Sequence, residues 1–315
     1  MIAIEGLKVM QGDFAYDVDW RVREYAELAD DHIGLAIDGL EYGEISPDGS
    51  ATAGDEGFLF IKGGSNSWDA QIAGEAIISE VDFVRSCEDL TEFNEKCQSR
   101  GIASAVVVVP EKDIVYPEFS PNCRDVTLGT RSVDIFLKDF ENISYPLAEI
   151  LDLKRYVEVY HKRDSHFNAF GGFVVANACL QKIGCEAFFY REAPFNHAKF
   201  QDDLAVKWER FETMRRSVRP DYSETVLANG NPLTGLHLRI DSHVVNNGKK
   251  IIIYGDSYSW NPDAGLCRYM AYRFETVHFI WSRQIDWDVL DAIGPDAVVM
   301  ESAERFLIGG LVRRG

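Results

Sequence analysis

The stretch VDFVRSCEDLTEFNEKCQSRGIASAVVVVP (81–110) joins a helical pattern directly to an apolar run. Apolar residues between Val81 and Phe93 recur at mostly helical intervals, and Gly101 ends that pattern. The run 102–110 is rich in β-branched residues and ends in proline, which is typical of a strand buried on both faces of a parallel sheet. A helix followed by a buried strand is the repeating unit of α/β proteins.

The same alternation continues on both sides of this stretch. Toward the N-terminus, turns rich in Gly and Asp predict short strands over 35–61, including GFLFI (57–61). Toward the C-terminus, buried strands and helices alternate, which predicts an α/β, three-layer sandwich with a mostly parallel sheet. The patterns predict helices over 143–156, 169–184 and 199–218, a strand running into a loop over 157–168, a buried strand within 249–260, a helix feeding a strand over 265–281, and a helix, strand and turn over 286–310.

Composition excludes several function classes. The formal net charge of -19 repels nucleic acid and anionic membrane surfaces, and no apolar window is long enough for a membrane span. The first twenty residues do not resemble a secretory signal, so the sequence as written predicts a cytoplasmic protein, or a periplasmic or extracytoplasmic one if a leader was removed. We expect one domain over 1–315, with 1–55 either a strand-rich extension or simple edge strands.

IIIYGDSYS (251–259) carries the strongest chemical pattern. A buried strand ends at Gly255, which permits a tight turn, and Ser257 then follows at the carboxyl edge of the predicted sheet. A nucleophilic serine needs such a position, with backbone N–H groups near a developing oxyanion. The alternative is an ordinary turn in which Asp256 and Ser257 only cap a helix.

RDSHFN (163–168) offers the partners that such a serine requires. Asp164 and His166 are two residues apart, so in an extended or loop backbone their side chains point to the same side. The carboxylate would then fix the imidazole tautomer and leave Nε2 to act as a base. A solvated histidine in an exposed loop is one alternative, and a metal site formed by His161, Asp164 and His166 is another.

Other residues are weaker candidates for a substrate or oxyanion contact. Gly63, Gly64, Ser65 and Asn66 form a polar turn that would line the pocket or remain an ordinary surface turn. Tyr258 would contact substrate or fill the core, and Arg305 would pair with a carboxylate or contact substrate. Lys112 and Tyr116 lie after the strand 105–109, in a predicted loop at the sheet edge. The six cysteines form no C-x-x-C pair, so we expect reduced thiols, no metal and no cofactor.

These motifs together resemble a known family. RDSHFNAFGGFVVANA is similar to the Asp-x-His-(Trp/Phe)-(Asn/Thr) segment and following helix of the alginate O-acetyltransferase family of SGNH-hydrolase-like proteins. GDSYS resembles that family's nucleophile segment, and AVVVVPEKDIVYPE (105–118) and PDAVVMESAERFL (295–307) fall in the same order. The resemblance covers roughly 55–307. Asp-x-His precedes the serine by about ninety residues, which is the reverse of the order in ordinary SGNH hydrolases.

The resemblance implies that Ser257, His166 and Asp164 form a catalytic triad in an O-acetyltransferase. Its partners would be an acyl donor, either acetyl-CoA or an acylated partner protein, and a carbohydrate acceptor. Two alternatives remain: a carbohydrate esterase with the same triad, and a catalytically idle glycan-binding protein. The absence of an evident export signal and of room for an appended carbohydrate-binding module are departures from the alginate enzymes.

Overall fold

A computed structural model gives the fold of the chain. It describes residues 39–64, 66–187, 195–208, 212–218, 220–228 and 235–311. Most of the predicted N-terminal extension 1–55 therefore lies outside the described residues, as does Ser65. In the part of the chain that the structure describes, no helix is both long and apolar enough to cross a membrane.

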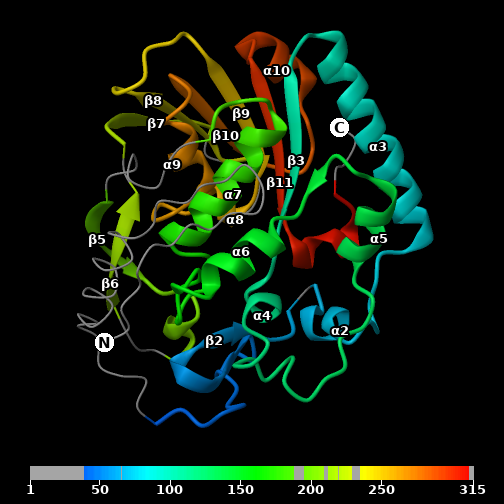
Figure 1. Cartoon of the computed structure of the whole chain (residues 1–315), viewed down its shortest axis with the longest axis vertical. Helices are drawn as coiled ribbons and strands as arrows, with labels where there is room; N and C mark the ends of the chain where they lie inside the picture. The colour runs from blue at the N-terminus through cyan, green and yellow to red at the C-terminus, as the bar shows by residue number, and fades with distance from the viewer. Residues whose placement is uncertain are drawn as a thin grey trace.

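A seven-stranded mixed sheet forms the centre of the fold (Figure 1). Five neighbouring strands run parallel, the sixth is antiparallel to them, and the seventh pairs antiparallel with the sixth and so runs in the same direction as the five. In spatial order, the strands are β4 (Ile143–Ser144), β3 (Ala103–Val109), β11 (Ala297–Ala303), β9 (Lys250–Gly255), β10 (Thr276–Trp281), β8 (His237–Ser242) and β7 (Tyr222–Ala228). The predicted mostly parallel sheet is confirmed.

Helices cover both faces of this sheet, which gives three layers. Val107 and Ile253 point into a core shared with α6 (Leu147–Lys154), α7 (Ala169–Lys182) and α9 (Leu266–Met270). Their neighbours Val108 and Ile252 point into a second core with α3 (Glu80–Ser99), α5 (Ser132–Asp139) and α10 (Trp287–Ile293). Side chains alternate between the faces of a strand, so β-branched runs satisfy both cores. In Figure 1, α6 and α7 lie in front of the sheet and α3 lies at its side.

Smaller elements surround the carboxyl edge of the parallel strands. In Figure 1, β11 leads downward to this edge, near α2, α4 and the hairpin that contains β2. The described elements outside the central sheet and its covering helices are β1 (Ala51–Ala53), η1 (Asp55–Gly57), β2 (Leu59–Ile61), α2 (Trp68–Ile72), α4 (Lys112–Val115), β5 (Phe195–Gln201), η3 (Ala205–Trp208), β6 (Glu212–Val218), α8 (Ser257–Trp260) and η4 (Glu304–Gly309).

The residues at the two ends of α3 explain where this helix begins and ends. Ser79 caps α3, because its side chain accepts a hydrogen bond from the backbone N–H of Asp82 at 3.1 Å. Gly101 follows the helix with φ of 69°, the left-handed conformation that glycine adopts without a Cβ clash. The helix and the strand after it are therefore both confirmed.

The helix predicted over 199–218 is wrong. Seven residues of β5 pair antiparallel with seven residues of β6, and the short η3 lies in the described part of the connection between them. The acidic start and basic end suited a helix dipole, but pairing between distant backbone groups overrides such a local preference.

Two other predictions need correction. Within 143–156, Ile143 and Ser144 join the sheet edge, and the helix starts only after Pro146. Within 157–168, the expected strand is reduced to an isolated bridge between Tyr160 and Phe167. The rest of 157–168 is a loop, and this loop carries Asp164 and His166.

Candidate active site

The strand β9 ends in a turn that presents Ser257. Asp256 caps α8, because its Oδ1 accepts from the backbone N–H of Tyr258 at 3.0 Å. Its Oδ2 accepts from the backbone N–H of Ala303 at 2.8 Å, which fastens the turn to the end of β11. Ser257 is the first residue of α8 and is partly exposed.

The backbone of this turn packs closely against a buried carboxyl group. Glu301 Oε2 accepts from the backbone N–H of Asp256 at 3.1 Å and from Ser259 Oγ at 2.7 Å. A Cβ added at Gly255 would lie only 2.6 Å from Glu301 Oε2 and 2.7 Å from Ser259 Oγ, so a side chain here would displace one of these two groups. Burial, followed by repulsion from Asp256, raises the pKa of Glu301 well above its usual range.

The Asp-x-His loop brings its two side chains together. Asp164 Oδ1 accepts from His166 Nδ1 at 2.7 Å and from the backbone N–H of His166 at 2.9 Å. Asp164 Oδ2 accepts from the backbone N–H of Asp203 at 3.1 Å. Directly after the loop, Asn168 Oδ1 accepts from the backbone N–H of Phe170 at 2.9 Å, which caps α7. The predicted contact between this aspartate and this histidine is present.

The second ring nitrogen of His166 has no such partner. Its Nε2 is buried and makes no hydrogen bond with any residue that the structure describes. Burial opposes the charged imidazolium, but the hydrogen bond and charge of Asp164 outweigh it, so the pKa of His166 is raised. The ring packs edge-on against Tyr258, the residue after Ser257, with 5.0 Å between ring centroids.

Besides this ring contact, two polar contacts join the Asp-x-His loop to the segment that carries Ser257. Tyr258 Oη donates to the carbonyl of Ser165 at 2.9 Å. His161 Nε2 lies 2.7 Å from Asp263 Oδ2, and Asp263 is fully buried. Tyr258 is also fully buried, so its ring packs between the two segments rather than presenting a surface to substrate.

A buried lysine supports the loop from the other side. Lys112 Nζ donates to the carbonyls of Leu59 at 2.8 Å, Lys162 at 2.7 Å and Asp164 at 3.1 Å. Burial lowers the pKa of Lys112 to about 7, although acidic neighbours led by Asp164 oppose the shift. The residue was expected in a loop but is the buried first residue of α4.

Arg305 lies beside the same ring of Tyr258. Its guanidinium carbon is 5.8 Å from the Tyr258 ring centroid, and Nη1 donates to Glu111 Oε1 at 2.7 Å. Gln71 Nε2 donates to the carbonyls of both Asn66 and Arg305, at 2.7 and 2.9 Å. Asn66 lies between Gly64 and Ser67, whose backbone groups are hydrogen-bonded, so Gln71 holds Asn66 near Arg305. Arg305 pairs with a carboxylate, as one of its two predicted roles required.

One group of described residues has donor atoms close enough for a metal ion. It comprises Asp164, His166 and Asp203, whose atoms lie within 4.8 Å of one another. Asp203 already accepts from the backbone N–H of Ser165 at 2.7 Å and from Ser165 Oγ at 2.5 Å, and the Lys112 ammonium bonds the same loop. His161, which the metal alternative required, pairs with Asp263 instead. Hydrogen bonds therefore account for this cluster.

Sequence reasoning did not find Asp203 or the pair formed by His161 and Asp263. The residue Asp203 falls within the segment that was wrongly predicted as a helix, so its proximity to Ser165 was hidden.

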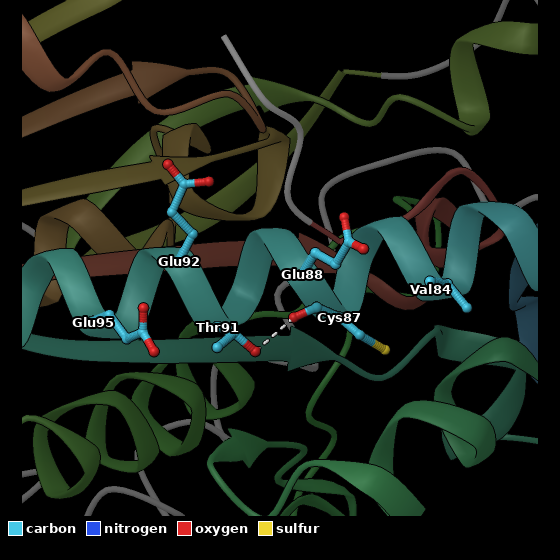
Figure 2. Close-up of a pocket in the computed structure, with 6 residues that line it drawn as sticks. All are labelled: Val84, Cys87, Glu88, Thr91, Glu92 and Glu95. Carbon is cyan, nitrogen blue, oxygen red and sulfur yellow. Dashed lines mark hydrogen bonds between the residues drawn. The ribbon is translucent and has the colours of Figure 1, made fainter.

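A separate hollow lies on α3 and is lined by six residues that include Cys87, Glu88 and Glu92 (Figure 2). None of the six belongs to the candidate site. All six cysteines are free thiols.

A family model for the SGNH hydrolase-like domain of the acetyltransferase AlgX matches residues 53–276. The chain belongs to this family. Membership places it among SGNH-hydrolase-like enzymes that act on acyl groups, and it confirms the fold and the resemblance inferred from the motifs. Among curated proteins, no sequence is significantly similar to this chain.

Solved structures resemble this chain at low sequence identity, and two of them share its fold at a TM-score above 0.5. Bacillus cereus PatB1 with a sulfonyl adduct is 10% identical, with a TM-score of 0.58 over 84% of this chain and 100% of that chain. A DHHW family protein from Eubacterium siraeum is 15% identical, with a TM-score of 0.53 over 82% and 95%. The O-acetyltransferase domain of Pseudomonas putida AlgJ is 16% identical, with a TM-score of 0.48 over 82% and 92%.

Proposed function

We propose that this family member transfers an acetyl group to a carbohydrate hydroxyl through an acyl-serine intermediate. Ser257 is the nucleophile, His166 the general base and acid, and Asp164 the residue that orients the imidazole. The observation that carries the proposal is the 2.7 Å contact between Asp164 and His166 Nδ1, with Nε2 left unbonded beside the residue that follows Ser257.

The first half of the reaction acylates the serine. His166 Nε2 takes the proton from Ser257 Oγ while Oγ forms a bond to the acyl carbon of the donor. The bond between that carbon and the donor's leaving group breaks, and the leaving group accepts the proton from Nε2. Asp164 stabilises the transient imidazolium, in keeping with the raised pKa of His166.

The second half regenerates the enzyme. A sugar hydroxyl gives its proton to Nε2 and attacks the acyl carbon, and Ser257 Oγ leaves and recovers that proton. Arg305 and the turn that contains Gly64 and Asn66 are proposed to line the substrate side of the site. The donor depends on the compartment: acetyl-CoA in the cytoplasm, or an acylated partner protein outside it.

Covalent labelling tests the proposal most directly. We expect phenylmethylsulfonyl fluoride to add one sulfonyl group to the wild type, located at Ser257 by peptide mapping. The Ser257→Ala variant should remain unlabelled, and its turnover of p-nitrophenyl acetate should fall about a thousandfold or more. Ser99→Ala, a change at the exposed end of α3, is the matched control and should behave as the wild type. Labelling at another residue, or equal turnover by Ser257→Ala, contradicts the proposal.

The identity of the acceptor separates the transferase from its alternatives. Acetylated oligosaccharide, detected by mass spectrometry after incubation with p-nitrophenyl acetate, supports transfer. Release of acetate alone, with the serine labelled, points to an esterase, in which water replaces the sugar hydroxyl. An unlabelled serine together with no turnover leaves the idle glycan-binding alternative.

A further inference from the structure

The short helix α8 exposes two of its four side chains on one face. Ser257 and Trp260 are three residues apart, which places them on the same side of a helix, and both are partly exposed. Tyr258 and Ser259 between them are buried. The helix therefore presents the indole of Trp260 on the same side as the hydroxyl of Ser257.

The neighbouring strand adds a second indole at the same edge. Trp281 is the last residue of β10 and is in register with Gly255 at the end of β9. Because β9 and β10 are parallel, the residues at their carboxyl ends meet at the same edge of the sheet. The rings of Trp260 and Trp281 have centroids 5.8 Å apart and planes inclined by 45°, and Trp281 is partly exposed too.

Packing holds both indoles in place. Trp260 and Trp281 rest on the core that contains α7 and α9, and Phe279 lies 6.1 Å from Trp281, measured between ring centroids. A rigid aromatic surface loses little side-chain entropy when it binds a ligand. Indole faces carry partial negative charge, which attracts the electropositive C–H groups on the faces of sugar rings.

We infer that Trp260 and Trp281 form an acceptor subsite, on which a sugar ring of the carbohydrate stacks beside Ser257. The inference rests on the proposed function, because it gives the acceptor of that reaction its binding surface. The hydroxyl that is acetylated then belongs to the stacked ring or to its neighbour in the oligosaccharide.

Binding alone is measured first, in the Ser257→Ala background, so that no turnover intervenes. The chain has six tryptophans, so 5-fluorotryptophan labelling gives six fluorine NMR resonances that single substitutions can assign. The probes are pentasaccharides of glucose, mannose, N-acetylglucosamine and a uronic acid. With at least one probe, we expect the resonances of Trp260 and Trp281 to shift in a saturable manner. Trp287 is the internal reference, since it lies on α10 against Lys96 and Arg100.

Kinetics of the otherwise intact enzyme form the second measurement. Trp260→Ala and Trp281→Ala should each lower the ratio of sugar acetylation to acetate release about five- to tenfold at a fixed acceptor concentration. The Phe variants at both positions should recover most of that ratio, because they keep an aromatic face. Trp287→Ala, the matched control, should keep the wild-type ratio.

The outcomes separate this inference from the function on which it rests. If no probe shifts either resonance, or if both Ala variants keep the wild-type ratio, the subsite is overturned, even where Ser257 is labelled and essential. If Ser257→Ala turns over p-nitrophenyl acetate at the wild-type rate, the proposed function fails, whatever the fluorine spectra show.

Discussion

Glu301 places a carboxyl group, only 1% exposed, against the turn that carries Ser257. A carboxyl buried in this way is favoured in its neutral form, because ionisation would lose hydration and repel Asp256. The folded chain therefore holds a proton at Glu301 at pH values where the unfolded chain has released it. Above the unfolded pKa of about 4.3, stability falls as pH rises toward the folded value.

The Glu301→Gln variant should remove this pH dependence. The Gln side chain matches the neutral acid in shape, and its carbonyl oxygen still accepts from Ser259. We expect the variant to gain stability relative to the wild type as pH rises from 5 to 8, as measured by urea unfolding. Glu301→Ala, which leaves a cavity, should be less stable than the wild type at pH 5. Parallel pH profiles for wild type and Gln variant would show that Glu301 is ionised in the fold.

Lys112 is a positioning residue, because its Nζ bonds three carbonyls that include that of Asp164. Lys112→Met keeps the length of the side chain but removes all three hydrogen bonds. We expect kcat to fall on the order of tenfold to a hundredfold as the loop shifts, with KM for p-nitrophenyl acetate changed much less. Steady-state kinetics with parallel thermal unfolding distinguish this from misfolding. An unchanged kcat in a folded Lys112→Met variant would show that Lys112 does not position the loop that carries Asp164.

At the scale of elements, the site depends on the alignment of a loop with a helix start. Asp164 and His166 precede α7, whereas Ser257 opens α8, so the two segments come from distant parts of the chain. The pair formed by His161 and Asp263 joins them, with a 14% exposed histidine side chain against a fully buried carboxylate. Pairs of this kind are costly to break, because the remaining polar group stays buried.

A double-mutant cycle measures that join. His161→Gln and Asp263→Asn should each destabilise the fold, and the coupling energy between them should be about 1–3 kcal/mol. Each single variant should also lower kcat for p-nitrophenyl acetate more than it raises KM. A coupling energy near zero would mean that the contact does not hold the two segments together.

At the scale of the whole molecule, the sequence predicted those features that depend on residues close together in the chain. The apolar runs 102–110 and 251–254, rich in β-branched residues, are typical of strands covered on both faces, so the sheet and its helices were predictable. The contact between Asp164 and His166 was predictable because two residues of spacing suffice. The hairpin of β5 and β6 was not, because strand pairing depends on partners that a local pattern does not contain.

The supporting residues escaped prediction for the same reason. Lys112 and Leu59 are 53 positions apart, and Glu301 and Ser259 are 42 positions apart. Neither pair has a characteristic spacing, and a buried lysine or glutamate looks in sequence like any surface charge. Such contacts are known only once the topology is known.

The place of β11 in the sheet has a consequence for biosynthesis. This strand is the last described one in chain order, yet it lies between β3 and β9 and pairs with both. During synthesis, the loop with His166 and the turn with Ser257 emerge from the ribosome while the gap between these two strands is still empty. The two parts of the proposed triad would then be held by separate half-sheets, and the proposed acyl transfer would begin only after residues 297–303 have emerged and closed that gap.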